Sequence, residues 1–375
     1  MPGATGAWTM AEALAGGEHG ADAAVVRRRR AGAHRSSPTI RNVAAHVGVS
    51  AMTVSRALRD DPAVLPETRV RVLAAAQQLG YRRNELARTL RVGGTSGMVG
   101  LVVTNLANPF YAQLALGVET VSGKRGIKVV VSNTGDDVGR ERELVSDLAA
   151  RRVDGIVVVP AGEDQQHLDP GRLGGLPLVL VTRPPLGIEV DCVLLDDFGG
   201  AREATTALVR DGHRRIGFLG PPAAWTSAER LRGFRAALVD AGLPLDADLE
   251  RCAQRQVADA EAAAQGLLAL PDAPTALFCA NSRNTIGAYR AVRAGRQRLA
   301  LAGFDDFELA DVLDLPVKIV AYDTAAIGHY AAELLLERID AAASSVEAPP
   351  ARRVVLSTTV LQYGLAGRRT HLGAR

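Results

Sequence analysis

Residues 39–58 read TIRNVAAHVGVSAMTVSRAL, and this stretch predicts two short helices joined by a glycine turn. The first helix has apolar side chains at the i, i+3, i+4, i+7 spacing of one helical face, at Ile40, Val43, Ala44 and Val47. Gly48 then ends this helix, and Ser50 is placed as the N-cap of the second. The inward positions of the second helix are Val54, Ala57 and Leu58. The pattern therefore predicts a compact helix-turn-helix.

A helix pair in this register is typical of proteins that read DNA, because the second helix fits the major groove. Arg56 is the candidate for a base contact, since an arginine there can bond guanine O6 and N7. From this window alone, an ordinary helical hairpin whose arginines face water is the alternative. The predicted DNA-binding residues of the helix pair are Thr39, Ser50, Ala51, Met52, Thr53, Ser55 and Arg56.

A third helix is predicted to complete this domain. Pro66 suits its first position, and Gly80 closes it. Its predicted buried stripe consists of Val70, Leu73, Ala76 and Leu79. We therefore expect an all-α headpiece over residues 38–83. Residues 84–97 contain a short helix-capable stretch with basic residues on both sides of Leu90 and end in glycines and small polar residues, which predicts a hinge helix and linker.

From Met98 onward, short β-branched runs alternate with amphipathic helices, which is typical of parallel α/β architecture. Nine runs predict strands, at residues 98–103, 127–133, 155–160, 178–182, 192–196, 215–220, 276–280, 299–304 and 317–322. Because these runs are continuously apolar, helices are expected to cover both faces of each sheet. The number of strands favours two doubly wound sheets over one.

Several motifs occur in a specific order along the chain. They are TIRNVAAHVGVS, TVSRAL, ETRVRVLAAAQQLGY, NELARTLR, MVGLVVTNLANPFYAQLALGVE, RRVDGIVVVP, GHRRIGFLGPP, ERLRGFRAALVDAGLP, ALFCAN and LALAGFDDFELADVLD. In these motifs the chain resembles the lactose and galactose repressor (LacI/GalR) family of bacterial transcription regulators, over about residues 38–367. The resemblance implies a core of two lobes similar to periplasmic sugar-binding proteins.

The resemblance also implies where the lobes divide. The core spans residues 98–367, with a first lobe of about 98–196 and 323–345 and a second of about 197–320 and 346–367. Residues 368–375 form a tail. Residues 1–37 contain RRRR at positions 27–30, so we expect a disordered basic tail there, and a mis-assigned start codon explains the segment equally well.

In this family the stretch that matches NELARTLR becomes helical on DNA. The residue that matches Leu90 wedges into the minor groove at the centre of the operator and bends the duplex. The resemblance therefore implies DNA contacts in the hinge at Asn84, Ala87, Leu90 and Arg91. A small hydrophobic contact within a linker is the alternative role of Leu90.

Ligands of such two-lobed folds bind in the cleft at the carboxyl ends of the strands. Seven residues lie at or after the ends of predicted strands and match effector-contacting positions of the family. They are Asn108, Phe110, Asp136, Arg183, Arg230, Asn281 and Asp305. Each has a structural alternative. Asn108 can cap a helix, Phe110 can belong to the core, and Asp305 can satisfy a turn.

Two departures from the family pattern bear on the effector. Thr182 and Ser282 stand where the family commonly has aspartate. The predicted site thus has two carboxylates fewer than the family pattern but keeps its two arginines. A sugar acid or sugar phosphate is therefore a candidate beside a neutral sugar, because an arginine fork matches a carboxylate or phosphate. No cofactor is expected besides this small-molecule effector, and no metal, since the seven histidines show no metal-ligand spacing.

Charge and cysteine content agree with a DNA-binding protein of the cytoplasm. Residues 1–91 contain 14 arginines and seven acidic residues, whereas residues 92–375 contain 30 basic and 34 acidic residues. The basic end is the predicted DNA end. Three cysteines cannot pair completely, which favours a reducing cytoplasm, here at the nucleoid. No run of 18 apolar residues and no secretory pattern occurs, so we expect neither export nor a membrane partner.

Two other classes of protein fit less well. A transport-associated sugar-binding protein would carry an export signal and no headpiece. The motifs GxGxxG, GxxxxGK[ST], GxSxG and HExxH are all absent, so an enzyme is not expected. We expect a repressor that binds a palindromic double-stranded operator as a homodimer, because one headpiece reads about half a site. The absence of a heptad tail favours a dimer over a tetramer.

Overall fold

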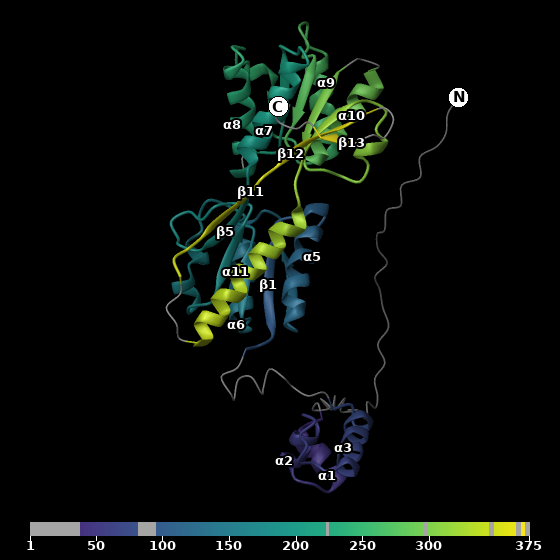
Figure 1. Cartoon of the computed structure of the whole chain (residues 1–375), viewed down its shortest axis with the longest axis vertical. Helices are drawn as coiled ribbons and strands as arrows, with labels where there is room; N and C mark the ends of the chain where they lie inside the picture. The colour runs from purple at the N-terminus through teal and green to yellow at the C-terminus, as the bar shows by residue number, and fades with distance from the viewer. Residues whose placement is uncertain are drawn as a thin grey trace, which may run out of the picture. The chain divides into compact units, whose positions relative to one another are not determined.

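The computed structural model describes residues 38–81, 95–222, 225–295, 299–344, 349–364 and 369–371. The chain divides into two compact units, Met1–Asn84 and Glu85–Arg375 (Figure 1). The first unit contains a three-helix headpiece, and the second contains two α/β lobes. The predicted fold class, an all-α headpiece followed by a two-lobed α/β core, is confirmed.

The headpiece helices are α1 (Ile40–Val47), α2 (Ala51–Ala57) and α3 (Pro66–Gln78). Gly48 ends α1 in the left-handed conformation at φ 72°. Ser50 caps α2, and its Oγ accepts a hydrogen bond of 3.0 Å from the Thr53 backbone N–H. The core between the helices is apolar and has Val43, Val54 and Val72 fully buried. The predicted helix-turn-helix is therefore confirmed.

The predicted stripe of α3 is wrong at two positions. Val70 and Leu73 are 66% and 49% exposed, whereas the buried residues of α3 are Val72, Ala75 and Ala76. The face that packs inward consists of Val72, Ala75, Ala76 and Leu79, which have the i, i+3, i+4, i+7 spacing, and it shares Ala76 and Leu79 with the predicted stripe. Small alanines let α3 approach the other helices closely, which the apolar pattern alone does not reveal.

The first lobe has a six-stranded parallel sheet in the order β11-β5-β4-β3-β1-β2. The strands are β1 (Met98–Val103), β2 (Lys128–Asn133), β3 (Gly155–Val158), β4 (Leu178–Val181), β5 (Asp191–Leu195) and β11 (Arg353–Leu356). The helices are α5 (Pro109–Lys124), α6 (Val138–Ala150) and α11 (Thr324–Ser344). One core cluster joins the sheet to α5 and α11, and another joins it to α6.

The second lobe has a seven-stranded sheet in the order β13-β12-β10-β9-β8-β6-β7. The strands are β6 (Ile216–Leu219), β7 (Glu250–Arg251), β8 (Ala276–Cys279), β9 (Ala300–Phe304), β10 (Val317–Ala321), β12 (Thr359–Tyr363) and β13 (Arg369–His371). The helices are α7 (Asp197–Arg210), α8 (Trp225–Asp240), α9 (Val257–Leu268) and α10 (Ser282–Gly295). Strands β12 and β13 are antiparallel to their neighbours.

The chain crosses between the lobes after β5, after β10 and between β11 and β12 (Figure 1). Residues 346–367 are predicted from the sequence to belong to the second lobe, and for β11 this prediction is wrong. Arg353 of β11 pairs with Cys192 of β5 in the first sheet, and β12 begins three residues after β11 ends. The last crossing therefore lies later in the chain than predicted, because two strands of different sheets follow each other almost directly.

Candidate DNA-reading helix and effector cavity

Helix α2 carries most of the headpiece residues predicted to contact DNA. Met52 is 61% exposed, and the Arg56 side chain is 52% exposed with its Nε 3.9 Å from Asp61. Thr39 and Ser50 cap α1 and α2, so each hydroxyl already accepts a backbone hydrogen bond within the headpiece. DNA contact by these residues remains a prediction, and Asn84, Ala87, Leu90 and Arg91 lie outside the described residues.

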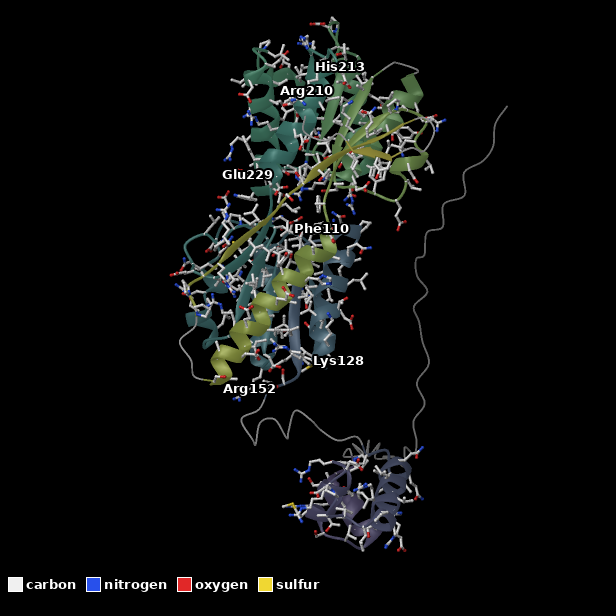
Figure 2. The ribbon with its side chains drawn as sticks, viewed as in Figure 1. Phe110, Lys128, Arg152, Arg210, His213 and Glu229 are labelled. Atoms are coloured by element: carbon white, nitrogen blue, oxygen red, sulfur yellow. The ribbon has the colours of Figure 1, made fainter. Side chains whose placement is uncertain are left out.

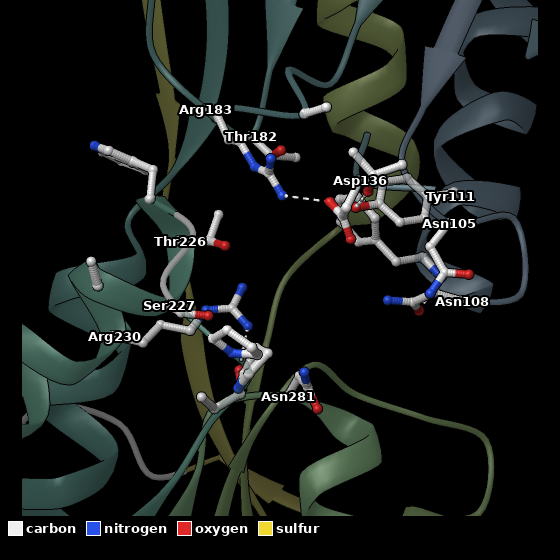
Figure 3. Close-up of a pocket in the computed structure, with 18 of the residues that line it drawn as sticks. Asn105, Asn108, Tyr111, Asp136, Thr182, Arg183, Thr226, Ser227, Arg230 and Asn281 are labelled. Atoms are coloured by element: carbon white, nitrogen blue, oxygen red, sulfur yellow. Dashed lines mark hydrogen bonds and ion pairs between the residues drawn. The ribbon is translucent and has the colours of Figure 1, made fainter. Parts of the chain in front are cut away.

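A cavity of about 640 Å³ lies between the two lobes (Figure 3). Its position follows from the topology, since parallel strands of both sheets present their carboxyl ends here. The structure brings together in its lining all seven predicted effector-binding residues, namely Asn108, Phe110, Asp136, Arg183, Arg230, Asn281 and Asp305. Their contact with an effector remains a prediction.

Arg183 and Asp136 form an ion pair on the wall of the first lobe. Asp136 follows β2 and Arg183 follows β4, and Arg183 Nη2 donates to Asp136 Oδ1 at 3.3 Å (Figure 3). Arg183 Nη1 also donates to the backbone oxygen of Pro160. The Nε of Arg183 is buried and has no hydrogen-bond partner among the described residues. The arginine is thus held by the protein while one buried donor is left unsatisfied.

Arg230 is held more firmly on the wall of the second lobe. Its Nε donates to Asp197 Oδ1 at 2.7 Å, and its Nη1 donates to Asp305 Oδ1 at 3.2 Å and to the Ala280 backbone oxygen at 2.6 Å. The guanidinium carbon lies 3.6 Å from the centre of the Phe304 ring, a favourable cation–π contact. Two carboxylates therefore already compensate the charge of this arginine.

Burial changes the acid–base behaviour of the groups around Arg230. It raises the pKa of Asp197 to about 6, although the neighbouring Arg230 acts in the opposite direction. It also raises the pKa of Tyr322 well above its ordinary value, and the Tyr322 hydroxyl donates to Asp305 Oδ1 at 2.7 Å. At neutral pH Tyr322 is therefore a hydrogen-bond donor at the cavity.

The two asparagines at the cavity each cap a helix, a structural role that was predicted as the alternative for Asn108 only. Asn108 Oδ1 accepts from the backbone N–H of Phe110 at 3.1 Å, and Asn281 Oδ1 accepts from that of Asn284 at 2.9 Å. Each side chain thereby caps a helix and also lines the cavity. Phe110 also has two roles, because it packs against the core of the first lobe and lines the cavity.

Backbone strain is concentrated at the cavity. Five non-glycine residues among those described have positive φ, and three of them line the cavity: Asp136 at 63°, Thr182 at 64° and Asp305 at 72°. For a β-branched residue such as Thr182 this conformation is a genuine outlier. Strain of this kind clusters at ligand sites, where the surrounding structure maintains it.

Several residues of the lining are not predicted from the sequence. Tyr111, Trp225 and Tyr322 add aromatic surface, and Gln165 joins two cavity loops by donating to the Pro184 oxygen at 3.1 Å and accepting from the Leu186 N–H at 2.8 Å. Tyr322 directly follows β10, so the rule of strand ends could have found it. Gln165 and Trp225 follow no strand directly, and no sequence signal marks them.

Two arginines of the second lobe reach across the mouth of the cavity. Arg283 Nη2 donates to the backbone oxygen of Ala107 in the first lobe at 3.1 Å. Arg255 Nη1 lies 3.9 Å from Asp136 Oδ2, which is also in the first lobe. These polar contacts join the lobes and depend on the angle between them.

Two kinds of feature are absent from the described part of the chain. It contains no group of three or more histidine, cysteine or acidic residues arranged to hold a metal ion. None of its helices is long and apolar enough to span a membrane.

Comparison with known proteins identifies the family. Residues 39–84 match "Bacterial regulatory proteins, lacI family", and residues 96–354 match "Periplasmic binding proteins and sugar binding domain of LacI family". The HTH-type transcriptional regulator CelR of Thermobifida fusca is 36% identical over 81% of this chain and 93% of its own length. The HTH-type transcriptional repressor PurR of Photobacterium profundum is 31% identical over 80% of this chain and 92% of its own.

A solved structure agrees with these matches. The complex of the transcriptional regulator CelR with cellobiose has a TM-score of 0.63 at 32% identity and covers 86% of this chain and 98% of its own. The relatives are transcription regulators rather than enzymes. The chain therefore belongs to the lacI family of bacterial regulatory proteins, as a DNA-binding transcription regulator with a sugar-binding type of effector domain.

Proposed function

We propose that this regulator is a repressor that binds a near-palindromic operator as a homodimer and responds to a neutral sugar of one or two rings in the cavity. The observation that carries the choice of effector is that two of the four arginines lining the cavity are closely paired with carboxylates, Arg183 with Asp136 and Arg230 with Asp197 and Asp305. The protein acts where the chromosome is, in the cytoplasm at the nucleoid.

Paired charges of this kind favour hydroxyl groups over an anion. A sugar hydroxyl can accept from a guanidinium and donate to the neighbouring carboxylate at the same time. An effector carboxylate or phosphate beside Arg230 would instead lie close to Asp197 and Asp305 in a buried setting, where like charges repel strongly. Of the candidates that the sequence left open, the pairing of Arg183 and Arg230 therefore favours a neutral sugar over a sugar acid or sugar phosphate.

The shape and lining of the cavity also support a sugar. Its volume of about 640 Å³ lies within the usual range of small-molecule sites. Phe110, Tyr111, Trp225 and Tyr322 provide apolar ring faces on which the C–H face of a sugar can pack. The relative CelR was solved with cellobiose, a neutral sugar of two rings.

The dimer is supported by the need to read two half-sites and by exposed apolar surface on the first lobe. Edge strand β2 exposes Val130 and Val131 at 38% and 40%, and α5 exposes Leu116 at 56%. An exposed strand edge with apolar side chains is a natural surface for a second copy of the chain. A two-fold dimer in turn requires a two-fold symmetric operator.

Two measurements test this proposal. Calorimetric titration with cellobiose, ribose, gluconate and glucose 6-phosphate should show binding of a neutral sugar and none of the anions. Selection of bound duplexes from a random DNA pool should return near-palindromic sites. Binding of gluconate or the phosphate alone would contradict the effector assignment, and recovery of no preferred sequence would contradict the operator assignment.

A further inference from the structure

The linker joins the second unit at one well-defined end of the first lobe. The backbone N–H groups of Ser96 and Gly97 donate to the two carboxylate oxygens of Asp154 at 2.5 and 2.8 Å. The Gly97 oxygen accepts from the backbone N–H of Lys128 at 2.8 Å, and the Met98 oxygen accepts from that of Asp154 at 2.8 Å. The point where the chain enters the sheet is therefore fixed relative to β2 and β3.

Four exposed cations surround this point, and we name them the linker-end patch: Lys124, Lys128, Arg151 and Arg152. Lys124 ends α5, Lys128 begins β2, and Arg151 and Arg152 follow α6. Figure 2 shows Lys128 and Arg152 at this same end of the lobe. Among the described residues, none of the four side chains has an ion pair or a hydrogen bond, and their charges are available to a partner.

The nearby carboxylates of Asp154 and Asp340 form no ion pair with the four cations and have other partners. Both oxygens of Asp154 are occupied by backbone N–H groups, and Asp340 is paired with Arg125 at 2.7 Å. The patch also contrasts with its surroundings, since residues 92–375 contain more acidic than basic residues. The concentration of cations at this end is therefore a local feature and not a reflection of a basic domain.

The ends of helices explain part of the pattern only. A helix C-terminus favours cations, which accounts for Lys124 and Arg151. Arg152 directly follows the C-cap of α6 in the left-handed conformation at φ 57°, so the helix end accounts for it too, whereas Lys128 begins a strand and is not explained by this effect. A phosphate backbone explains all four.

We propose that the linker-end patch binds the phosphate backbone of the duplex that the headpiece reads, an inference that rests on the proposed DNA-binding function. The thirteen residues between Tyr81 and Thr95 reach at most about 50 Å when fully extended. This covalent limit is compatible with contact between the patch and a duplex that the headpiece holds, and the charge of the patch is complementary to phosphate. Such contacts add affinity without adding sequence preference.

The test measures how the affinity for DNA depends on salt. In full-length protein, all four residues are changed to glutamine (K124Q/K128Q/R151Q/R152Q), and Kd for a 40-base-pair duplex of arbitrary sequence is measured by fluorescence anisotropy between 50 and 200 mM KCl. Each lost phosphate contact lowers the slope of log K against log [salt] by about 0.9. We expect the slope to fall by about 2 to 4, with at least a tenfold loss of affinity at low salt.

The matched control removes four exposed arginines of the second lobe (R210Q/R214Q/R290Q/R293Q), of which Arg210 is labelled far from the patch in Figure 2. It should keep the wild-type slope. A smaller variant, K128E/R152E, repeats the measurement with two changes and should also lower the slope. An unchanged slope in the patch variants, or an equal fall in the control, would overturn the inference. Failure of the wild type to bind any duplex would instead overturn the DNA-binding function itself.

Discussion

At the scale of single residues, several side chains of the cavity combine a structural bond with a place in the lining. Asn108 and Asn281 each use one oxygen to cap a helix and still line the cavity. Arg230 is held by the carboxylates of Asp197 and Asp305 and by the ring of Phe304, so its position does not depend on a ligand. Such a site is preorganised, and an effector that binds there needs to order few side chains.

Arg56 provides the residue-scale prediction for DNA recognition. Its exposed side chain on α2 should contact a base, so Arg56→Ala should cost about 1 to 3 kcal/mol of binding free energy and relax the preference at one base position. The measurement is Kd together with sequence selection from a random pool.

Arg59→Ala is the control for loss of charge. Arg59 is also exposed, and its Nε donates to the backbone oxygen of Ser55. This variant should weaken binding to all sequences alike. If Arg56→Ala leaves the selected sequences unchanged, Arg56 does not read a base.

At the scale of elements, α5 and α11 cross where Gly117 and Gly328 face each other. A Cβ added at Gly328 would lie 2.3 Å from the Leu114 backbone oxygen and 2.9 Å from the Gly117 Cα. Because these are backbone atoms, the helices would have to move apart. Gly328→Ala should therefore lower the free energy of unfolding by about 1 to 3 kcal/mol, measured by urea denaturation.

Gly266 in α9 is a matched control, since a Cβ added there has no atom within 4 Å. Gly266→Ala should raise the free energy of unfolding by about 0.5 to 1 kcal/mol, because alanine favours a helix and restricts the unfolded chain. A stabilising effect of Gly328→Ala would show that the helix crossing tolerates separation.

Asp191 anchors three elements of the first lobe. Arg338 of α11 donates to both its oxygens at 2.8 Å, and the backbone N–H of Arg352, next to β11, donates at 2.7 Å. Burial acts to raise the pKa of Asp191, but these hydrogen bonds outweigh it and hold the pKa below its ordinary value. The carboxylate therefore stabilises the folded state at pH values above about 4 and loses this effect as pH falls through the lower, folded-state pKa.

Asp191→Asn should cost about 3 kcal/mol at pH 7, because it leaves the buried end of Arg338 without its counter-charge. The free energy of unfolding of the variant should also decrease less on acidification than that of the wild type. Urea denaturation of both proteins between pH 3 and 7 measures this. Parallel curves for the two proteins would mean that Asp191 does not account for the acid sensitivity.

The elements also show what sequence can and cannot predict. All nine predicted strands are present, and residues at strand ends reach the cavity because parallel strands share one carboxyl edge. The buried face of α3 was mispredicted because Val70 and Leu73 are three residues apart, as are Val72 and Ala75. Spacing alone therefore does not show which pair faces the core. Residues such as Gln165 and Arg255 enter the cavity from loops, whose positions depend on packing between segments distant in sequence.

At the scale of the whole molecule, the effector can act on DNA only through the lobes and the linker. The first lobe contains the fixed linker entry at Asp154, and the cavity lies between this lobe and the second. A ligand that changes the angle between lobes therefore changes contacts that cross the cavity mouth. Coupling of this kind between two sites typically amounts to about 1 to 3 kcal/mol.

Arg283 is the contact through which this coupling can be tested. Its hydrogen bond to the Ala107 oxygen exists when the lobes have the angle seen here, so Arg283→Ala should shift the molecule toward a more open form. We expect effector binding to weaken about three- to tenfold in calorimetry and the radius of gyration in X-ray scattering to increase, with unchanged thermal stability. Arg290→Ala, an exposed arginine on the same helix, should change neither. Weaker binding at an unchanged radius would mean that Arg283 contacts the effector directly and does not act through the lobes.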